Sequence, residues 1–297
     1  MDPLVVHWNM DPEIFRIGGF AVRWYGLLFV SGFILGYWMF VKFFEREKLD
    51  KTILDPLLYT LLIGTLVGAR LGHCLFYGFD EYFGSWKGVL EIFKVWEGGL
   101  ASHGGAIMLL LCMWWFSWKY GRKNNIDFLW IMDHLCIAVA FAGAFIRLGN
   151  LCNSEIYGLQ TDLPWGFIFE RRGFTEARHP TMLYESLTYF LLGLLLVWLY
   201  VKKLDRMYRG SFIGIFFIIC FGVRFIIEFV KEASRYYDVL GFTLNTGQVL
   251  SIPFILAGIF LVIYSFWKKV PARAVIPERK PRKAEPTHYA KSLNGNK

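Results

Sequence analysis

A dense group of polar residues follows one long apolar segment of the chain. The apolar segment spans 128–146, and four polar residues come directly after it: Arg147, Asn150, Asn153 and Glu155. Because an unpaired polar group at the edge of hydrocarbon is costly, such a group is unusual there. A guanidinium fork suits a phosphate, and amides with a carboxylate suit hydroxyl groups. The spacing therefore favours a lipid-headgroup site over a plain polar loop.

Other polar and ionisable residues lie within or beside further apolar segments. They are Tyr25, Arg70, His73, His103, His179, Tyr184, Glu185, Arg224, Glu228, Asn245 and Gln248. Each one alone has a structural explanation. Arg224 and Glu228, four residues apart on one helix face, could form a structural ion pair. His103, flanked by glycines, could be a packing residue, and Tyr25 could belong to an interfacial aromatic belt.

The composition is that of a membrane protein. The chain has 297 residues, of which 56% are hydrophobic and 19% aromatic, and its mean hydropathy is +0.41. An apolar helix of about 20 residues spans a bilayer. We therefore predict an all-α polytopic membrane protein. Its seven transmembrane helices are expected at 20–41, 53–77, 98–118, 128–146, 181–201, 211–230 and 247–267.

The distribution of basic residues predicts the orientation of these helices. Of the 32 Lys and Arg, 20 fall on the side of the bilayer that holds the C-terminus and 10 on the other side; Arg70 and Arg224 lie inside apolar runs. The positive-inside bias therefore places the N-terminus outside and the C-terminus in the cytoplasm. The formal charge of +8 does not indicate nucleic acid, because nine of the basic residues lie in the last 30 positions. Such a tail suits a membrane surface.

The segments outside the predicted helices differ in character. Residues 1–19 are expected to be an extracytoplasmic N-terminal segment without a cleavable signal, and 20–268 the seven-helix transmembrane domain. Within that domain, 79–97 alternates charged and apolar residues, which predicts an amphipathic interfacial arm. Residues 151–180 predict a small extracytoplasmic head with a short strand pair. Residues 269–297 predict a basic, disordered cytoplasmic tail.

Once the helices are oriented, the polar residues share one depth. All seven predicted helices place such groups in the outer leaflet, whereas their middle and inner stretches are comparatively free of them. A shared depth favours a functional site over separate structural roles. A transporter or channel would also bury charges, but no inverted repeat is apparent and no polar series reaches the cytoplasmic leaflet. A non-catalytic lipid-binding scaffold is the third alternative. Five scattered cysteines without CxxC spacing do not indicate a metal site.

The chain resembles the prolipoprotein diacylglyceryl transferase family. The longest matching motif is Arg147-Leu-Gly-Asn-Leu-Cys-Asn-Ser-Glu-Ile-Tyr-Gly158. The other matching stretches are Trp24-Tyr25-Gly26, Gly68-Ala-Arg-Leu-Gly72, Ser102-His-Gly-Gly105, His179-Pro180 with Tyr184-Glu185, Arg224-Phe-Ile-Ile-Glu228 and Gly247-Gln-Val-Leu-Ser-Ile-Pro253. The chain departs from the family at Lys231-Glu-Ala-Ser234, where an Arg-x-Pro-Asp stretch is usual, at Met182, where Gln is usual, and at Thr246, where Met is usual.

The resemblance implies an enzyme of the bacterial inner membrane, with its active site toward the outer leaflet. The family takes the diacylglyceryl group from phosphatidylglycerol and places it on the lipobox cysteine of a prolipoprotein signal peptide, releasing glycerol phosphate. This is the first step of lipoprotein maturation, and it implies neither a cofactor nor a metal. The thiolate is the nucleophile, and the departing phosphate gains a second negative charge.

The resemblance and this chemistry together give expected roles to the polar residues. His103 is the candidate base for the thiol, and Arg147 and Arg224 are candidate phosphate clamps. Glu228 would orient Arg224. The expected substrate-binding residues are Arg147, Tyr25, Arg70, Asn150, Asn153, Glu155, Gly158 and Gln248.

Overall fold

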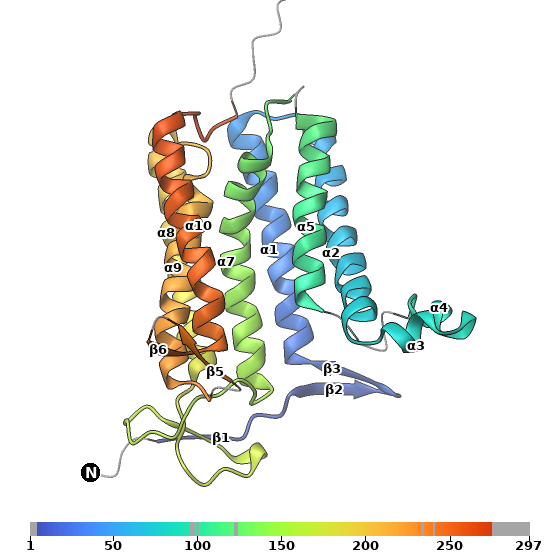
Figure 1. Cartoon of the computed structure of the whole chain (residues 1–297), viewed down its shortest axis with the longest axis vertical. Coiled ribbons are helices and arrows are strands. Elements are labelled where there is room, and N and C mark those ends of the chain that lie inside the picture. The colour runs from blue at the N-terminus through green and yellow to red at the C-terminus, as the bar shows by residue number, and fades with distance from the viewer. Residues whose placement is uncertain are drawn as a thin grey trace, which may run out of the picture.

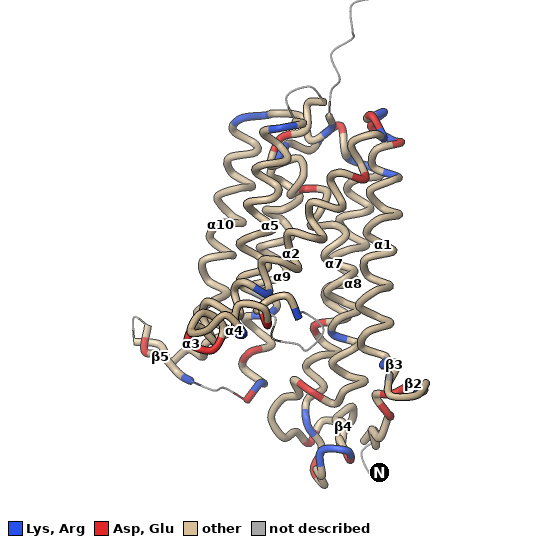
Figure 2. Tube along the Cα trace, turned by 90° about the vertical axis from the view of Figure 1, so that its right-hand side faces the viewer, with Lys and Arg blue, Asp and Glu red and all other residues tan. Residues whose placement is uncertain are grey.

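Long helices running side by side dominate the computed structural model, which describes residues 5–94, 99, 101–121, 124–232, 235–239 and 241–274 (Figure 1). The long helices are α1 Trp24–Glu47, α2 Leu54–Phe76, α5 Ser102–Phe116, α7 Phe128–Cys152, α8 Thr181–Lys203, α9 Ser211–Ile227 and α10 Thr246–Lys268. We call the end of the bundle where α1 begins the head end, and the end where α10 finishes the tail end. Charged residues gather at these two ends, with long uncharged stretches between them (Figure 2).

Six helical stretches are long and apolar enough to cross a membrane, counting only the part of the chain that the structure describes. This confirms the prediction of a polytopic helical membrane protein. The exception among the seven predicted segments is the third. There α5 has 15 residues and continues as a 5-residue π-helical turn, Ser117–Gly121. Since 15 residues give an α-helix about 22 Å long against about 30 Å of hydrocarbon, the seventh span stays a prediction.

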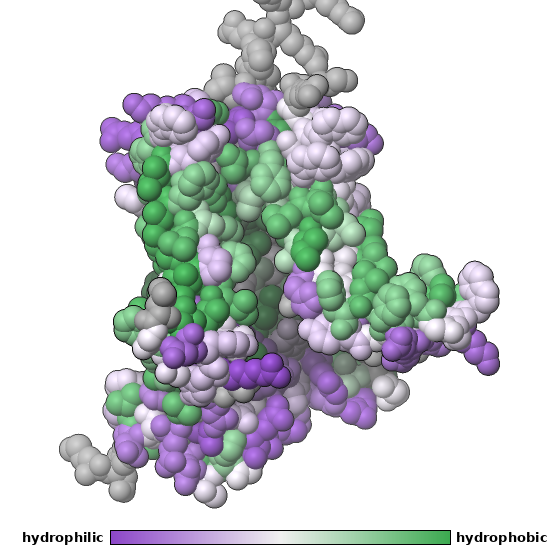
Figure 3. Space-filling view, in the orientation of Figure 1, coloured by the Kyte–Doolittle hydropathy of each residue, from purple (hydrophilic) through white to green (hydrophobic). Residues whose placement is uncertain are grey.

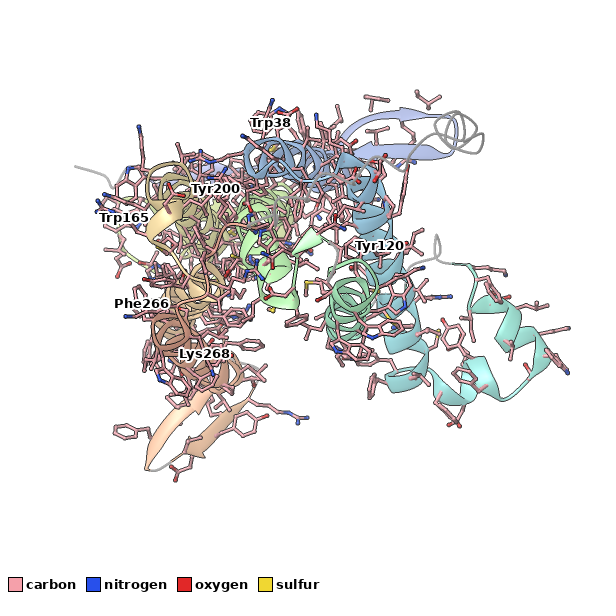
Figure 4. The ribbon with its side chains drawn as sticks, turned by 90° about the horizontal axis from the view of Figure 1, so that it is seen from above. Trp38, Tyr120, Trp165, Tyr200, Phe266 and Lys268 are labelled. Carbon is pink, nitrogen blue, oxygen red and sulfur yellow. The ribbon has the colours of Figure 1, made fainter. Side chains whose placement is uncertain are left out.

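The helices form two groups. Helices α2 and α5 pack closely on each other, whereas α7 lies against α1, α8 and α9, and α10 packs on α9 (Figure 4). A close approach between α2 and α5 is possible because Gly72 faces Gly104: a Cβ on Gly72 would lie 2.7 Å from the Gly104 Cα. In Figure 4, Trp38 and Phe266 lie on the outside of the bundle, and Tyr200 lies between helices.

A shared hydrophobic core joins the two groups. It contains Leu57 and Leu61 of α2, Met113 and Phe116 of α5, and Trp130 of α7. Because Trp130 is near the start of α7 and Phe116 ends α5, this contact lies toward the tail end. Farther toward the head end, the surface between the α10 side and the α5 side is hollowed and bordered by hydrophobic residues (Figure 3).

The tail-end half of the bundle is not free of ionisable residues, contrary to our expectation. Glu47, Asp133 and His134 are all buried there. Asp133 accepts hydrogen bonds from the backbone N–H groups of Gly210 and Ile213, at 2.6 and 2.9 Å, and so satisfies the start of α9. A carboxylate suits a helix N-terminus because the exposed N–H groups there need acceptors.

Short elements occur at the head end. Helices α3 Phe79–Phe83 and α4 Trp86–Glu91 project from the bundle as a short arm, within the predicted interfacial segment 79–97 (Figure 1). Residues 95–97 of that prediction lie outside the described residues. The single turns η4 Glu170–Arg172 and η6 Glu228–Val230 also lie at the head end, whereas η1 Lys51–Ile53 and η5 Leu204–Arg206 lie at the tail end.

Within the described residues, three two-stranded sheets also lie near the head end. Strands β2 Glu13–Ile17 and β3 Phe20–Arg23 form an antiparallel hairpin. Strands β5 Tyr236–Val239 and β6 Phe242–Asn245 form another. The first helix therefore begins at Trp24 and not at residue 20 as predicted, because the four residues before it pair with β2.

The predicted strand pair within 151–180 occurs as isolated antiparallel bridges, in which Arg178 pairs with Phe167 and with Gln160. Strand β4 Phe167–Phe169 pairs in parallel with β1 Val6–Trp8, so the N-terminal segment completes this part of the structure. In β4 the two phenylalanines, Phe167 and Phe169, are buried, and Ile168 between them is half-buried. Their cluster includes Leu151 and Met182, with Trp8 packed against it.

Residues 269–274, the first part of the predicted disordered tail, are ordered. Pro271 forms a backbone bridge with Tyr208, and Ala272 and Ala274 are buried. The backbone N–H of Ala274 donates to Glu47 Oε2 at 2.7 Å. Small side chains and this buried acceptor hold residues 271–274 against the tail end, and 275–297 lie outside the described residues.

Candidate active site

The polar residues that follow the fourth apolar segment lie together at the head end of α7. Asn150 Oδ1 accepts from an Arg147 Nη at 3.1 Å, and its Nδ2 donates to Glu155 Oε1 at 2.8 Å. Asn153 Nδ2 donates to the same Glu155 oxygen at 3.2 Å. The two predicted amides thus hold Glu155, and one of them also contacts Arg147.

A sharp change of chain direction positions this group. Helix α7 ends at Cys152, and two residues then adopt left-handed backbone conformations: Ser154 at φ 52° and Ile156 at φ 62°. A positive φ is unfavourable for a β-branched residue such as Ile156. Strained backbone of this kind tends to occur at functional sites, where the surrounding contacts hold it. Here it brings Glu155 back toward the end of α7.

An ionic network extends from Arg147 to two other helices. Arg147 Nε lies 2.6 Å from Glu185 Oε2, near the start of α8. Lys231 Nζ lies 2.6 Å from the other oxygen of Glu185 and 3.2 Å from Glu228 Oε1. Arg224 Nε lies 3.9 Å from the same oxygen of Glu228. Three cations and two carboxylates therefore alternate across the ends of α7, α8 and α9.

The network is shielded from solvent to different degrees. The Glu185 side chain is 0% exposed and that of Lys231 is 9% exposed, whereas Arg224 retains 32%. Buried ion pairs of this kind are stable only when each charge is matched. The more exposed arginine is thus able to meet a ligand without breaking a buried pair.

The start of α10 supports this network from the side. Asn245 and Gln248 form a capping box, in which each side chain binds the backbone of the other residue. Asn245 Nδ2 also donates to the carbonyl of Glu228 at 2.8 Å. Gln248, predicted to bind substrate, is 2% exposed and uses its amide oxygen in the capping box. In this structure it positions α10 beside Glu228.

Gly158, expected to bind substrate, lies closely against the chain's own backbone. Its N–H donates to the His179 carbonyl at 2.8 Å, and it pairs across an antiparallel bridge with Lys231. A Cβ at this position would collide with the Val230 carbonyl and would approach the Thr181 side chain to 2.8 Å. Only glycine fits there.

Tyr25 lies beside the same group. Its ring packs against Gly149 on α7, and it is close enough to Glu155 and Arg147 to interact with their charges. The predicted headgroup residues Tyr25, Arg147, Asn150, Asn153 and Glu155 are therefore brought together. They come from α1, α7 and the turn that follows α7.

Arg70 and His103 lie outside this group. Arg70 is buried and donates to the carbonyls of Glu91, Ile92 and Gly99, at 2.6, 2.9 and 3.2 Å, so it anchors the arm. The ring of His103 lies 5.3 Å from that of Phe76 and 5.7 Å from that of Tyr77, between centroids. It is exposed, and no hydrogen bond to it occurs within the described ranges.

Side-chain hydrogen bonds connect the segment 151–180 to the start of α8. Trp165 Nε1 donates to the Tyr184 hydroxyl at 3.0 Å, and that hydroxyl lies 3.2 Å from His179 Nδ1. The hydroxyl accepts from the indole and still has its own hydrogen, which it can donate to an unprotonated Nδ1 of the imidazole. Burial lowers the pKa of His179, which keeps the ring neutral and able to accept.

A cavity of about 330 Å³ adjoins the network on its polar side. It is lined by Glu155, Ile156, Tyr157, Arg172, Lys231 and Glu232. Arg172 donates to the carbonyls of Ser154 and Asn153, at 2.8 and 3.3 Å, and so holds the strained turn from the cavity side. Within the described ranges, no group of three or more His, Cys, Asp or Glu side chains is arranged to hold a metal ion.

Two central residues were not assigned a role from the sequence. Glu185 was noted only as a polar residue that opens the fifth apolar segment, and Lys231 only as a departure from the family pattern. Their contact joins residues 46 positions apart, which no local spacing reveals. A carboxylate at the start of a membrane helix, followed by an apolar run, was the available signal, since such a group requires a partner.

The prolipoprotein diacylglyceryl transferase family profile matches residues 12–264 of this chain. Curated relatives named phosphatidylglycerol--prolipoprotein diacylglyceryl transferase agree with that match. The protein of Tolumonas auensis is 43% identical over 265 residues, covering 89% of this chain and 99% of the relative. That of Porphyromonas gingivalis is 43% identical over 274 residues, covering 88% and 95%. That of Bacteroides fragilis is 37% identical over 276 residues, covering 90% and 97%. The family resemblance inferred from the motifs is thus confirmed.

Proposed function

The chain belongs to the prolipoprotein diacylglyceryl transferase family, and from that premise we propose that it transfers the diacylglyceryl group of phosphatidylglycerol to the cysteine thiol of a prolipoprotein. The acceptor is the lipobox cysteine of the signal peptide, and the reaction is the first step of bacterial lipoprotein maturation. The observation that carries this proposal, beyond the family match, is the network of Arg147, Glu185, Lys231, Glu228 and Arg224.

The reaction replaces a carbon–oxygen bond of the lipid with a carbon–sulfur bond to the peptide. The thiolate sulfur forms a bond to the carbon of the diacylglyceryl group that carries the phosphate. The bond between that carbon and the phosphate oxygen breaks. The departing glycerol phosphate changes from a diester to a monoester and gains a second negative charge. Since the thiolate is the reactive form, the thiol proton must pass to a base. Cations held close to the leaving oxygen lower the barrier most, because they act where charge develops.

Arg147 and Arg224 are the proposed phosphate clamps. Arg147 contacts Glu185 at 2.6 Å, and Arg224, 3.9 Å from Glu228, is exposed enough to meet a ligand. A guanidinium binds a phosphate through two parallel hydrogen bonds, so it both orients the diester and stabilises the departing monoester.

The hydroxyl groups of the glycerol head would bind beside Arg147. Asn150, Asn153 and Glu155 supply amide and carboxylate groups there, and Tyr25 supplies a phenol. An ionised carboxylate only accepts hydrogen bonds, whereas an amide and a phenol also donate them. This combination suits a diol.

His103 remains the proposed base for the substrate thiol. Its exposed ring is free of hydrogen bonds to the described residues, so a ring nitrogen is available to take the thiol proton. The hollowed surface between the α5 side and the α10 side separates the two helix groups at this end (Figure 3). A peptide or lipid bound there would bridge α5, which carries His103, and the network on α7 to α9.

The same proposal assigns sides to the molecule. The head end faces the extracytoplasmic side of the inner membrane, seven helices cross it, and the tail end faces the cytoplasm. The excess of Lys and Arg around the tail end supports this orientation, because basic residues favour the cytoplasmic side. The site then lies in the outer leaflet, where secreted precursors present their signal peptides.

One assay separates this function from its rivals. Purified protein is mixed with phosphatidylglycerol and a lipobox peptide, and the thioether peptide and glycerol phosphate are measured by mass spectrometry. A transferase gives both products in equal amounts. A transporter or a lipid-binding scaffold gives neither, although the scaffold still binds the lipid.

A matched pair of variants then tests the clamp. Arg147→Lys keeps the charge but loses the bidentate fork, so turnover and phosphatidylglycerol binding are both expected to fall in a folded protein. Arg171→Lys makes the same change at an exposed position outside the network and serves as control. Full activity of Arg147→Lys would show that Arg147 does not bind the phosphate through its guanidinium fork.

A further inference from the structure

We propose that Lys231 is a positioning residue of the transferase site. Its ammonium group binds the two carboxylates, Glu185 and Glu228, that also contact the arginines. By holding these carboxylates, Lys231 leaves the Arg224 guanidinium available for a phosphate and fixes Glu185 where it orients Arg147. The inference rests on the proposed function, since it adds a residue to the same site.

The position of the Lys231 side chain fits this role. Its Nζ lies 2.6 Å from Glu185 Oε1 and 3.2 Å from Glu228 Oε1, and the side chain is 9% exposed. A lysine ammonium has three donors, so it can bridge two carboxylates at once. Two buried carboxylates this close to one cation would repel each other if that cation were absent.

The arginines depend on this shared cation in different ways. Glu185 contacts two cations, each at 2.6 Å: Arg147 at one carboxylate oxygen and Lys231 at the other. Arg224 lies 3.9 Å from Glu228, which is beyond hydrogen-bond distance. Without the ammonium group, each carboxylate would have only its arginine as a partner. Arg224 would then be drawn toward Glu228 and away from a phosphate, and Arg147, already 2.6 Å from Glu185, would alone face that buried carboxylate.

The backbone around Lys231 is fixed by the polar segment that follows α7. Lys231 follows η6 in an extended conformation and pairs with Gly158 across an antiparallel bridge. The N–H of Leu159 donates to the Val230 carbonyl at 2.8 Å. Because these backbone contacts fix the position of Lys231, Gly158 also determines where the ammonium group lies.

Variants at position 231 test the proposal in the transferase assay. Lys231→Met removes the charge, and kcat/KM is expected to fall about 10- to 100-fold, the effect of losing charged hydrogen bonds. Lys231→Gln keeps two donors without the charge and carries the test if the methionine variant does not fold. Lys231→Arg restores the charge and should recover most of the activity. Lys202→Met, at an exposed lysine in the last turn of α8, is the matched control and should behave as wild type.

A double variant distinguishes positioning from a purely structural role. If Lys231 acts on Arg147 through Glu185, the loss caused by Lys231→Met should be several-fold smaller in an Arg147→Lys background. Losses that multiply in the double variant would overturn the proposal. So would folded Lys231→Met and Lys231→Gln variants with wild-type kcat/KM.

A binding measurement keeps this inference separate from the proposed function. Phosphatidylglycerol in detergent micelles should raise the unfolding temperature of the wild-type protein, and raise it less for Lys231→Met. If wild-type protein forms no thioether product, the proposed function fails whatever the variants do. An equal thermal shift in wild type and Lys231→Met would instead overturn the role of Lys231 alone.

Discussion

The buried carboxylate of Glu47 should govern the stability of the tail end. Four donors surround it, at 2.6 to 2.9 Å: His134 Nε2, the Tyr200 hydroxyl, Trp130 Nε1 and the N–H of Ala274. The Glu47 side chain is 0% exposed. The other ring nitrogen of His134 donates to the Trp130 carbonyl, so one further proton lies between the imidazole and the carboxylate.

Two substitutions at Glu47 should therefore differ in effect. Glu47→Ala leaves four buried donors without an acceptor, which costs about 3–5 kcal/mol by analogy with a broken buried ion pair. At about 2–4 °C per kcal/mol for a chain of this size, the unfolding temperature should fall by about 6–20 °C. Glu47→Gln should cost far less. Its amide oxygen can accept from Trp130 and Ala274, while its NH₂ donates to a neutral His134 and to Tyr200.

The five cysteines provide the assay, because four of them are buried and none forms a disulfide. A dye that fluoresces on reacting with thiols reports unfolding as the temperature rises. Glu45→Gln is the matched control: it removes a carboxylate paired with Lys42 and Lys51 at the surface, and should not move the transition. An unchanged transition in Glu47→Ala would refute the importance of the network. Equal losses in Glu47→Ala and Glu47→Gln would refute the proton placement.

Three further predictions concern the site and the orientation. His103→Gln should keep phosphatidylglycerol binding and lower turnover by about 10²–10⁴-fold. Turnover should partly recover as the pH is raised toward the pKa of the substrate thiol, because more of the thiol is then thiolate. A pH–rate profile parallel to wild type would exclude His103 as the base. Gly158→Ala forces the backbone near Val230 apart, so kcat/KM should drop at least as much as in Lys231→Met, and wild-type kinetics would show that the close approach is dispensable. Reporter fusions should place Arg122 in the cytoplasm and Asp80 outside, and an extracytoplasmic signal at Arg122 would contradict the proposed orientation.

Local spacing predicted the part of the site that lies on one stretch of chain. Arg147, Asn150, Asn153 and Glu155 are within nine positions, so the end of α7 and the turn after it had to bring them together. The sequence could not show which distant residue completes the network. Glu185 and Lys231 meet because α8 and η6 pack beside α7, and that packing depends on the whole bundle.

The errors in the fold prediction have a common physical cause. Apolar runs mark membrane helices, but they do not distinguish an apolar strand from the first turn of a helix. Residues 20–23 therefore read as helix although they pair with β2. Asp133 and His134 were overlooked at the tail end because the run around them is otherwise apolar. An ionisable residue in such a run was itself a sign of a buried partner.

The parallel pairing of β1 with β4 has a consequence for the order in which the chain is completed. Val6 pairs with Phe167, so the first strand made during synthesis waits for a partner about 160 residues later. At about 5–20 residues per second, that delay is about 8–32 s. During this time several helices are already in place while the N-terminal strand has an open edge. The formation of this sheet therefore joins an early part of the chain to one made much later.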